Sequence, residues 1–264
     1  MTLDAILPYP ACIGVVHLGA LPGAPGYNGD FTSLRAQALR EALIYEKAGL
    51  SGLIVENFGD APFFKDNVPP ETIAAIAVVT SDIVREISIP VGVNILRNDA
   101  CAALAVAASA GASFIRVNIH SHAALTDQGI IEGRAAQSLR MRARLNPDIK
   151  ILADLRVKHA APLAEISLSD EIRDLEERGM ADGLILTGRG TGQSVDPSEL
   201  SKAAGTARNP LFVGSGVNAN NVKELASHAQ GFIVGSAFKQ GRSAKNPVDA
   251  KFVEEFMSHV KQIQ

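Results

Sequence analysis

Residues 211–239 read LFVGSGVNANNVKELASHAQGFIVGSAFK. Two short apolar runs, at 211–216 and 232–237, each end in a Gly-Ser turn, and a segment of mixed polar and apolar character lies between them. An apolar run, a helical segment and a second apolar run are typical of two parallel strands joined by a crossover helix. This stretch therefore predicts a parallel α/β fold.

The same unit recurs along the whole chain. Six more short runs rich in β-branched residues precede it, with helical stretches between them, so that strands are expected at 13–18, 52–57, 91–96, 114–119, 151–158, 183–188, 211–216 and 232–237. Eight such units in 264 residues fit one (β/α)8 barrel, the TIM barrel, because these barrels run to roughly 250 residues. We expect a single domain over residues 1–264. An open doubly wound sheet has the same local pattern and is the alternative.

Alternation within two strands indicates which residues face the inside of the barrel. In FIRVNIH, residues 114–120, and in ILADLRVK, residues 151–158, polar side chains alternate with apolar ones. Successive strand residues point to opposite faces, and the apolar face packs on the surrounding helices. The residues expected to face inward are Arg116, Asn118 and His120 of the first strand and Asp154, Arg156 and Lys158 of the second.

Composition and charge exclude several classes of partner. The chain has 47% hydrophobic and 20% charged residues with a net charge of -3, and its basic residues do not gather into a stripe as in nucleic-acid-binding proteins. No apolar run approaches the ~20 residues that cross a bilayer, and the N-terminus lacks the pattern of a secretory signal. We therefore expect a cytoplasmic protein without a nucleic-acid partner or membrane span. Formation of a homo-oligomer stays open.

The two Gly-Ser turns predict a phosphate-binding site for a small phosphorylated molecule. Glycine lets the backbone approach a ligand closely, and the loops after the last two strands of a barrel commonly bind phosphate. Amides at the start of a following helix would also face the anion. Tight turning, which any barrel needs, is the alternative explanation for these glycines. The predicted binding residues are Gly214, Ser215, Gly216, Gly235 and Ser236, with Arg116 and Gly188 from neighbouring strands.

Acid–base candidates follow other strands. Glu56 ends the second expected strand and Asp154 lies in the fifth, and either carboxylate is a candidate proton-transfer base. Lys158 is a candidate electrophile or Schiff-base amine if burial and Arg156 lower its pKa. Lys158 lies four positions after Asp154 in the same expected strand, which is about 13 Å along it, so these two side chains should not touch. The alternative is a structural ion network between Asp154 and Arg156.

Four of the six histidines fall at or just after expected strands: His17, His120, His122 and His159. Histidine serves both proton transfer and metal ligation, and His17, Glu56 and His120 are a candidate set for a divalent metal such as zinc, manganese or iron. No HExxH-type spacing places two ligands on one element. The alternative is that these histidines are hydrogen-bonded to inward-facing carboxylates and to the backbone.

Two loops are long enough to act as lids. NFGDAPFFKDNVPP, residues 57–70, and HSHAALTDQGIIEG, residues 120–133, both exceed the roughly 4–6 residues of an ordinary connection. Asp60, Asp127 and Glu132 are the candidates to reach the mouth of the barrel. Solvation at the surface is the alternative for all three.

Nine motifs, taken in order, resemble the BtpA family of barrel proteins over essentially the whole chain: VVHLGALPGAPGY, LIVENFGDAPF, GVNILRND, IRVNIH, TDQGIIEG, ADLRVKHA, TGRGTG, GSGVNANN and IVGSAFKQG. The family takes its name from a photosystem I biogenesis factor, and other relatives sit beside sugar-transport and sugar-kinase functions, so the resemblance implies no single activity. It adds Asn94 and Thr187 to the binding candidates and Asn118 and His159 to the catalytic ones. Carried over by position, the motifs nominate His17, Glu56, Asn57, Asp60, Asn94, Arg97, Asn118, Asp127, Glu132, Asp154, Lys158, His159 and Thr187.

These features together favour an enzyme that acts on a small phosphorylated sugar or related metabolite, as an isomerase or epimerase or as an aldolase or lyase. A phosphate anchor suits such chemistry, because binding energy at a remote group positions the reacting carbon. One alternative is a non-catalytic assembly factor for a membrane complex such as photosystem I, which predicts a large exposed apolar patch and an interior whose polar groups are all paired. A metal-dependent hydrolase is the other.

Overall fold

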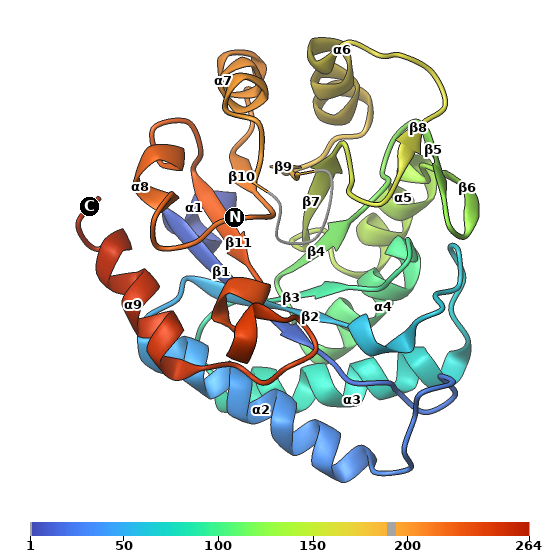
Figure 1. The fold of residues 1–264 in the computed structure, drawn as a ribbon. Coiled ribbons are helices and arrows are strands. Elements are labelled where there is room, and N and C mark those ends of the chain that lie inside the picture. Colours follow the sequence, from blue (N-terminus) through green and yellow to red (C-terminus); the bar gives the residue numbers. More distant parts are fainter. Residues whose placement is uncertain (1, 189–193, 264) are drawn as a thin grey trace.

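A closed barrel of eight parallel strands forms the centre of the molecule in the computed structural model, which describes residues 2–188 and 194–263 (Figure 1). The strands lie in the order β1-β11-β10-β9-β7-β4-β3-β2, and β1 pairs with both β11 and β2, which closes the sheet. The predicted barrel is confirmed, and the open sheet is excluded. The strands are β1 (Ala11–His17), β2 (Gly52–Glu56), β3 (Val91–Asn94), β4 (Phe114–Val117), β7 (Lys150–Leu155), β9 (Gly183–Leu186), β10 (Leu211–Val213) and β11 (Gly231–Val234).

Helices cover the outside of the barrel (Figure 1). Their starts and ends follow local signals in the sequence: the Asp99 side chain accepts a hydrogen bond from the first turn of α4, and Gly49 and Gly111 end α2 and α4 in the left-handed conformation. The helices are α1 (Leu3–Ile6), α2 (Phe31–Ala48), α3 (Pro70–Glu86), α4 (Ala100–Ala110), α5 (Ala135–Leu145), α6 (Leu168–Arg173), α7 (Pro197–Thr206), α8 (Val222–Leu225) and α9 (Ala250–Val260). Short helical turns are η1 (Phe58–Asp60), η2 (Asp174–Arg178), η3 (Ser236–Phe238) and η4 (Gln240–Arg242).

Alternate strand residues contribute to two separate cores. Ile115 and Ile151 belong to the core between the sheet and the helices, whereas their strand neighbours Phe114 and Leu152 belong to the core inside the barrel. The inner core also contains Leu3 at the start of α1. The predicted alternation therefore holds for both strands, and α1 packs against the amino-terminal end of the barrel interior.

The inward-facing polar series of β7 is shorter than expected. The strand ends at Leu155, and Arg156 takes a positive φ of 50°, a left-handed conformation that reverses the chain direction. Its exposed guanidinium pairs with Glu171, with Nε to Oε2 at 3.4 Å, and with Glu199. The placement of Arg156 inside the barrel, and its predicted ion network with Asp154, are wrong because strand alternation stops before this residue.

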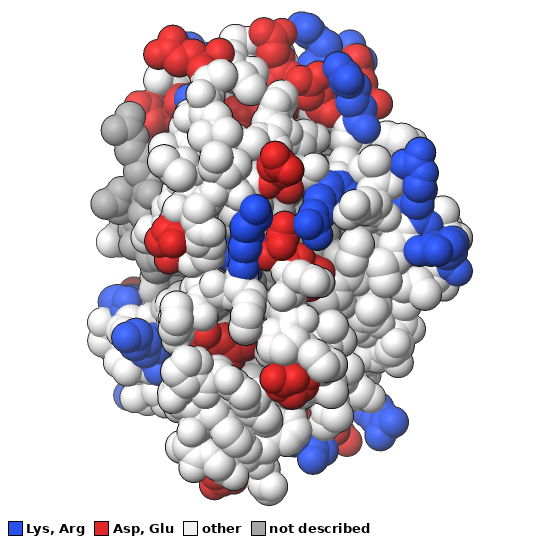
Figure 2. All heavy atoms as spheres, turned by 90° about the vertical axis from the view of Figure 1, so that its right-hand side faces the viewer, with Lys and Arg blue, Asp and Glu red and all other residues white. Residues whose placement is uncertain are grey.

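The loop at 120–133 folds into a hairpin. β5 (Ala123–Thr126) and β6 (Gly129–Glu132) pair antiparallel, and β8 (Ala161–Pro162) adds to the other edge of β5. This small sheet lies on the right-hand side of Figure 1, the side that faces the viewer in Figure 2. Acidic and basic groups lie beside each other near the centre of that face, and most of the surface below them is uncharged.

Within the described ranges, none of the helices has both the length and the apolar character to cross a membrane.

Candidate functional site

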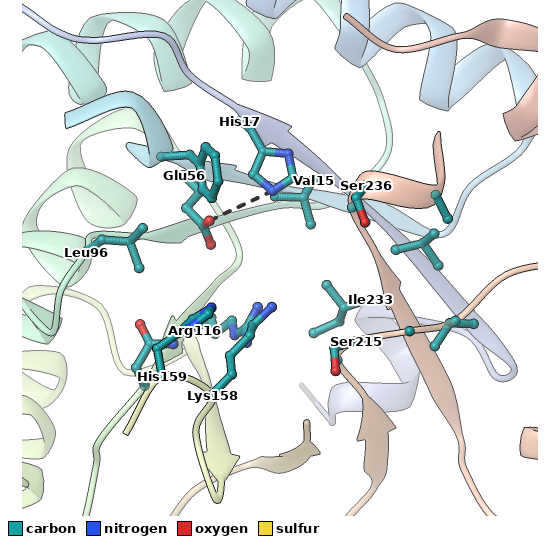
Figure 3. Close-up of a pocket in the computed structure, with 18 of the residues that line it drawn as sticks. Val15, His17, Glu56, Leu96, Arg116, Lys158, His159, Ser215, Ile233 and Ser236 are labelled. Carbon is teal, nitrogen blue, oxygen red and sulfur yellow. Dashed lines mark ion pairs between the residues drawn. The ribbon is translucent and has the colours of Figure 1, made fainter. Parts of the chain in front are cut away.

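A cavity of about 740 Å³ lies at the carboxyl-terminal end of the barrel (Figure 3). Its volume is within the range of small-molecule sites, and its place is where barrels of this kind hold their ligands. The turns after β10 and β11 form one wall, and residues of β2, β4 and the segment after β7 form the facing walls. The predicted site residues that line the cavity are His17, Glu56, Arg97, Arg116, Asn118, Asp127, Lys158, His159, Gly214, Ser215, Gly216, Gly235 and Ser236.

A buried hydrogen-bond network forms the base of this cavity. The Arg116 Nε and Nη2 atoms donate to Asp154 Oδ1 and Oδ2, both at 2.9 Å, and Asn118 Nδ2 donates to Oδ2 at 2.9 Å. Asn94 in turn donates to Asn118 Oδ1 at 3.2 Å. Burial alone would lower the pKa of Arg116, but the paired Asp154 raises it overall. Asp154 therefore lies beneath the cavity, where it holds the Arg116 guanidinium in place.

His17 and Glu56 lie side by side at the top of the cavity (Figure 3). His17 Nε2 and Glu56 Oε1 are 3.9 Å apart, too far for a hydrogen bond, and the His17 ring packs edge-on against Phe58. Burial, helped by nearby lysine and arginine charges, holds the pKa of His17 well below its usual range. Burial raises the pKa of Glu56, although Arg116 and Lys158 oppose that rise. A neutral imidazole beside a carboxyl group of raised pKa suits proton transfer.

Lys158 extends from the opposite wall toward the middle of the cavity (Figure 3). It follows the turn that Arg156 begins, so it reaches the cavity through a loop instead of through strand alternation. Burial, and then the charge of Arg116, lower the pKa of Lys158. An amine with a lowered pKa is more nucleophilic and exchanges protons more readily near neutral pH.

The two glycine turns form the remaining wall. Gly216 has a positive φ of 69°, and a side chain at Gly235 would place its Cβ 2.9 Å from His17 Cε1. Ser215 Oγ accepts a hydrogen bond from the Gly188 amide at 2.6 Å. The helix expected directly after the first turn is absent, since α8 begins only at Val222 and has four residues. The turns therefore line the cavity without a long helix behind them.

Comparison with known proteins assigns the family. Residues 9–262 match the model of the BtpA family. The chain belongs to the BtpA family. An uncharacterised member from Pyrococcus furiosus is 47% identical over 236 residues, which cover 89% of each chain. The photosystem I biogenesis protein BtpA of Synechocystis sp. is 42% identical over 246 residues, which cover 93% of this chain and 86% of its own.

Solved structures confirm the barrel of this BtpA-family protein. Thiamine phosphate pyrophosphorylase from Pyrococcus furiosus superimposes with a TM-score of 0.60 at 15% identity, covering 96% of each chain. N-(5'-phosphoribosyl)anthranilate isomerase from Pyrococcus furiosus gives a TM-score of 0.58 at 17% identity, covering 96% of this chain and 98% of its own. Similarity at this level of identity establishes the fold alone.

The predicted metal ligands do not come together. His120 Nε2 is hydrogen-bonded to the Gly179 carbonyl at 2.8 Å, and His120 is not among the residues lining the cavity with His17 and Glu56. The two described ranges contain no group of three or more His, Cys, Asp or Glu side chains placed to hold a metal ion. The set of His17, Glu56 and His120 as ligands of one metal is therefore wrong, because β4 ends before His120 and the chain turns away.

Several other predicted residues support the site from outside the cavity. Asp60 is buried and accepts hydrogen bonds from the Leu21 amide at 2.8 Å and from Asn57, so it ties two loops together and does not reach the mouth. Glu132 is exposed on β6 and does not line the cavity. Thr187 donates to the Arg156 carbonyl at 2.9 Å. Residues 189–192 of the TGRGTG motif lie outside the described residues.

Other contributors carry no strong signal in the sequence. Asn218, Asn220 and Arg242 line the cavity from loops after β10 and β11, where polar residues are ordinarily solvated. Lys239 is fully buried, and its Nζ lies 2.6 Å from Glu41 Oε2 of α2, which is likewise buried. The sequence shows that Lys239 follows the last glycine turn closely, but it does not indicate that Glu41 on α2 is its partner.

Proposed function

We propose that this protein is an enzyme that binds a small phosphorylated sugar or related metabolite at the turns after β10 and β11 and acts on the carbon chain held between those turns and the facing wall. The observation that carries the proposal is the composition of the cavity of about 740 Å³ at the mouth of the barrel. Its glycine-serine turns lie beside His17 of β1, and Glu56 of β2 and Lys158 of the loop after β7 line the same cavity. A phosphate anchored at one wall would position the reacting carbon at the other.

In this proposal Glu56 is the general base and His17 its partner in moving a proton. The raised pKa of the buried Glu56 makes it a better proton acceptor than an exposed carboxylate, and neutral His17 can donate or accept at Nε2. Lys158 stabilises negative charge that develops on a substrate oxygen. These roles serve isomerase or epimerase chemistry directly, and Lys158 also provides the amine that a lyase of the Schiff-base type requires.

Buried polar atoms without partners support an enzyme over a scaffold. His17, which lines the cavity, has a buried Nδ1 with no hydrogen-bond partner among the described residues. Of the other such atoms, Asn94 Oδ1 lies in the network beneath the cavity, and Tyr9 Oη and Thr80 Oγ1 lie away from it. A buried polar atom left unpaired costs about 1–3 kcal/mol, which a protein retains where a ligand or ordered water supplies the missing bond. A barrel used only as a scaffold would be expected to pair its interior groups with one another.

An assembly factor is the second candidate, because a relative from Synechocystis sp. carries the name photosystem I biogenesis protein and the hairpin sheet exposes apolar side chains. Leu125 on β5, Ile130 on β6 and Leu163 just after β8 are 51%, 46% and 53% exposed.

A metal-dependent hydrolase receives no support from the described residues, since they bring no set of three candidate ligands together.

Ligand-dependent thermal stability tests the proposal. The wild-type protein is titrated with sugar phosphates and with the same sugars lacking phosphate, and the phosphorylated compounds alone are expected to raise the Tm. A ligand present at 100 times its Kd adds about 2.7 kcal/mol to the free energy of unfolding. Gly216→Val should abolish this effect, because the side chain would occupy the turn that meets the phosphate.

Gly129→Val is the matched control for that substitution. Gly129 also has a positive φ, of 91°, but it lies at the hairpin turn with open space around it. Both variants place a branched side chain on a residue with positive φ, and only Gly216→Val should lose the response to phosphorylated ligands. The proposal fails if no phosphorylated sugar raises the Tm of the wild type, or if Gly216→Val responds as the wild type does.

A further inference from the structure

Arg97 lies across the barrel from the glycine turn after β10, and Lys158 is its neighbour. In the order of the closed sheet, β3 and β4 are diametrically opposite β10 and β11. Arg97 follows β3 closely, and its Nη2 donates to the Lys158 carbonyl at 2.7 Å, so the loops after β3 and β7 are joined at this point. Both side chains line the cavity. The cavity therefore carries two neighbouring cations, of which Arg97 lies on the side away from the proposed phosphate site.

These two cations differ from the other buried cations of the interior in having no carboxylate partner. Arg116 is paired with Asp154, and Lys239 with Glu41, both in direct contact. Arg97 is buried and Lys158 half-buried, and neither forms an ion pair with any residue in the described part of the chain. The hydrogen bond from Arg97 to a backbone carbonyl orients the guanidinium without neutralising its charge.

Buried cations of this kind need an anion. Removing a guanidinium or an ammonium group from water costs several kcal/mol unless an opposite charge or strong hydrogen bonds replace the water. Burial lowers the pKa of both Arg97 and Lys158, because removal from water disfavours their charged forms. Asp154 and Glu56 are near enough to affect both pKa values, but among the described residues neither carboxylate forms an ion pair with Arg97 or Lys158, and Asp154 already accepts three hydrogen bonds from Arg116 and Asn118. The counter-ion is therefore expected from the ligand.

The surface between the two walls suits a carbon chain. Val15 and Ile233 line the cavity beside the glycine turns, and Leu96 lines it on the side of Glu56 (Figure 3). A ligand that spans this space would have polar groups at its ends and carbon atoms in the middle. A planar guanidinium binds a carboxylate through two parallel hydrogen bonds, and Lys158 can add a third.

We infer that the substrate bears a second anion, a carboxylate held by Arg97 and Lys158, at the end of the molecule opposite its phosphate. The substrate class is then a phosphorylated sugar acid instead of a neutral sugar phosphate. This inference rests on the proposed function, since it takes the glycine turns as the phosphate site, and it adds a specificity role for Arg97, which the proposed proton transfer does not use.

Matched pairs of ligands test the inference. Dissociation constants are measured by calorimetry for 6-phosphogluconate against glucose 6-phosphate and for 5-phosphoribonate against ribose 5-phosphate, with fructose 1,6-bisphosphate as a ligand with phosphate at both ends. The wild type is expected to bind the acid of at least one pair about tenfold more tightly than its neutral partner, a difference of about 1.4 kcal/mol.

Arg97→Gln is expected to remove that preference and to leave the Kd of the neutral sugar phosphate within about twofold, because the neutral ligand does not use the second anion site. Arg97→Lys keeps the charge and should retain part of the preference. Gly216→Val should instead weaken the acid and the neutral ligand alike. Circular dichroism and the Tm of each variant verify that it is folded before binding is compared.

Different outcomes would contradict the second-anion inference and the proposed function. If glucose 6-phosphate or ribose 5-phosphate binds and Gly216→Val abolishes binding, but neither acid is preferred or Arg97→Gln leaves the preference unchanged, the second-anion inference is overturned and the proposed function stands. Tighter binding of the bisphosphate than of both acids would overturn the assignment of the second anion as a carboxylate. If none of the phosphorylated ligands binds, the proposed function and the inference both fall.

Discussion

At the scale of single residues, two buried ion pairs fix the positions of the elements around the cavity. Arg116 and Asp154 join neighbouring strands below the cavity, and Glu41 and Lys239 join α2 to the segment after β11. A buried pair is not necessarily more stable than an apolar substitute, but removal of one partner leaves a charge that water cannot reach. Each pair therefore makes the position of one element depend on another that is distant in the sequence.

Glu41→Gln should destabilise the protein by about 3–5 kcal/mol, because Lys239 would remain buried without its counter-ion. Urea unfolding followed by circular dichroism measures the loss. Arg208→Gln serves as the control, since Arg208 pairs with Glu177 at the surface, and it should change stability by less than about 0.5 kcal/mol. Equal effects of the two substitutions would contradict the role given to the Glu41–Lys239 pair.

The titration of His17 gives a prediction for pH. His17 is held neutral in the folded protein because its pKa is well below the usual range, whereas in the unfolded chain it takes up a proton near its ordinary pKa of 6.5. The unfolded state thus binds more protons as the pH falls below that value, and the contribution of His17 to stability is present above it and lost below it. One such group changes the free energy of unfolding by up to about 1.4 kcal/mol per pH unit.

His17→Gln should therefore lose stability less steeply than the wild type between pH 7 and pH 5. The measurement is the free energy of unfolding from urea titrations at half-unit intervals of pH. His120 and His159, whose pKa values are also lowered by burial, contribute equally to both proteins and cancel in the comparison. Parallel pH profiles for the two proteins would show that His17 protonates normally in the folded state.

At the level of elements, the loops after the strands are tied to one another by side chains that also begin helices. Asp99 accepts from the Ala102 amide at 2.9 Å at the start of α4 and from the Val68 amide at 3.0 Å in the loop after β2. Asp30 makes a similar bond to Ser33 at the start of α2 but is exposed and holds no second loop. Asp30 therefore only caps α2, whereas Asp99 both caps α4 and holds the loop after β2.

Asp99→Ala should cost about 2–4 kcal/mol, because it removes a helix cap and leaves a buried backbone amide of the loop without an acceptor. Asp30→Ala should cost only about 1 kcal/mol, the ordinary value of an exposed cap. Thermal unfolding of both variants beside the wild type measures the difference. A loss at Asp99 no larger than that at Asp30 would indicate that the loop amide finds water or another acceptor.

Elements were predictable from the sequence as far as strand periodicity extends. Eight apolar runs sufficed for the barrel, and the alternation in β4 and β7 placed Arg116, Asn118 and Asp154 in the interior. The same alternation misplaced Arg156, because a single left-handed residue ends it and nothing in LRVK marks that conformation. Lys158 lines the cavity, and its reach into it depends on this turn.

Contacts between distant elements were not predictable in the same way. Glu41 lies in the middle of a helix whose polar residues otherwise read as a solvated face, and its partner follows 198 residues later. Arg97 was nominated only through resemblance to the family, since its position after β3 has no distinguishing local pattern. Both cases require knowledge of which loops meet in space, and periodicity carries no information about that.

For the molecule as a whole, closure of the sheet makes the first and last strands neighbours. β1 pairs with β11 from Ala11 opposite Gly231 to Gly14 opposite Val234. A closed sheet has no edge at which unfolding can begin without opening a pair of central strands. The inner core is likewise shared by residues of nearly all the strands, so no part of the barrel has a core of its own.

We therefore expect the 264 residues to unfold as one cooperative unit. Far-ultraviolet circular dichroism and the fluorescence of a dye that binds apolar surface should give coincident urea transitions. Two separate transitions would contradict the single-domain prediction. A chain ending before Gly231, which lacks β11, should show no cooperative transition, because the missing strand pairs with both β1 and β10.

The short helix α1 determines which end of the barrel is open to a ligand. Leu3 and Leu7, at the start and just after the end of α1, pack with Leu152 and Phe212 inside the barrel and close its amino-terminal end. In the proposed function, substrate and product must therefore use the same opening at the carboxyl-terminal end of the barrel. Accumulated product would then compete with substrate for that opening.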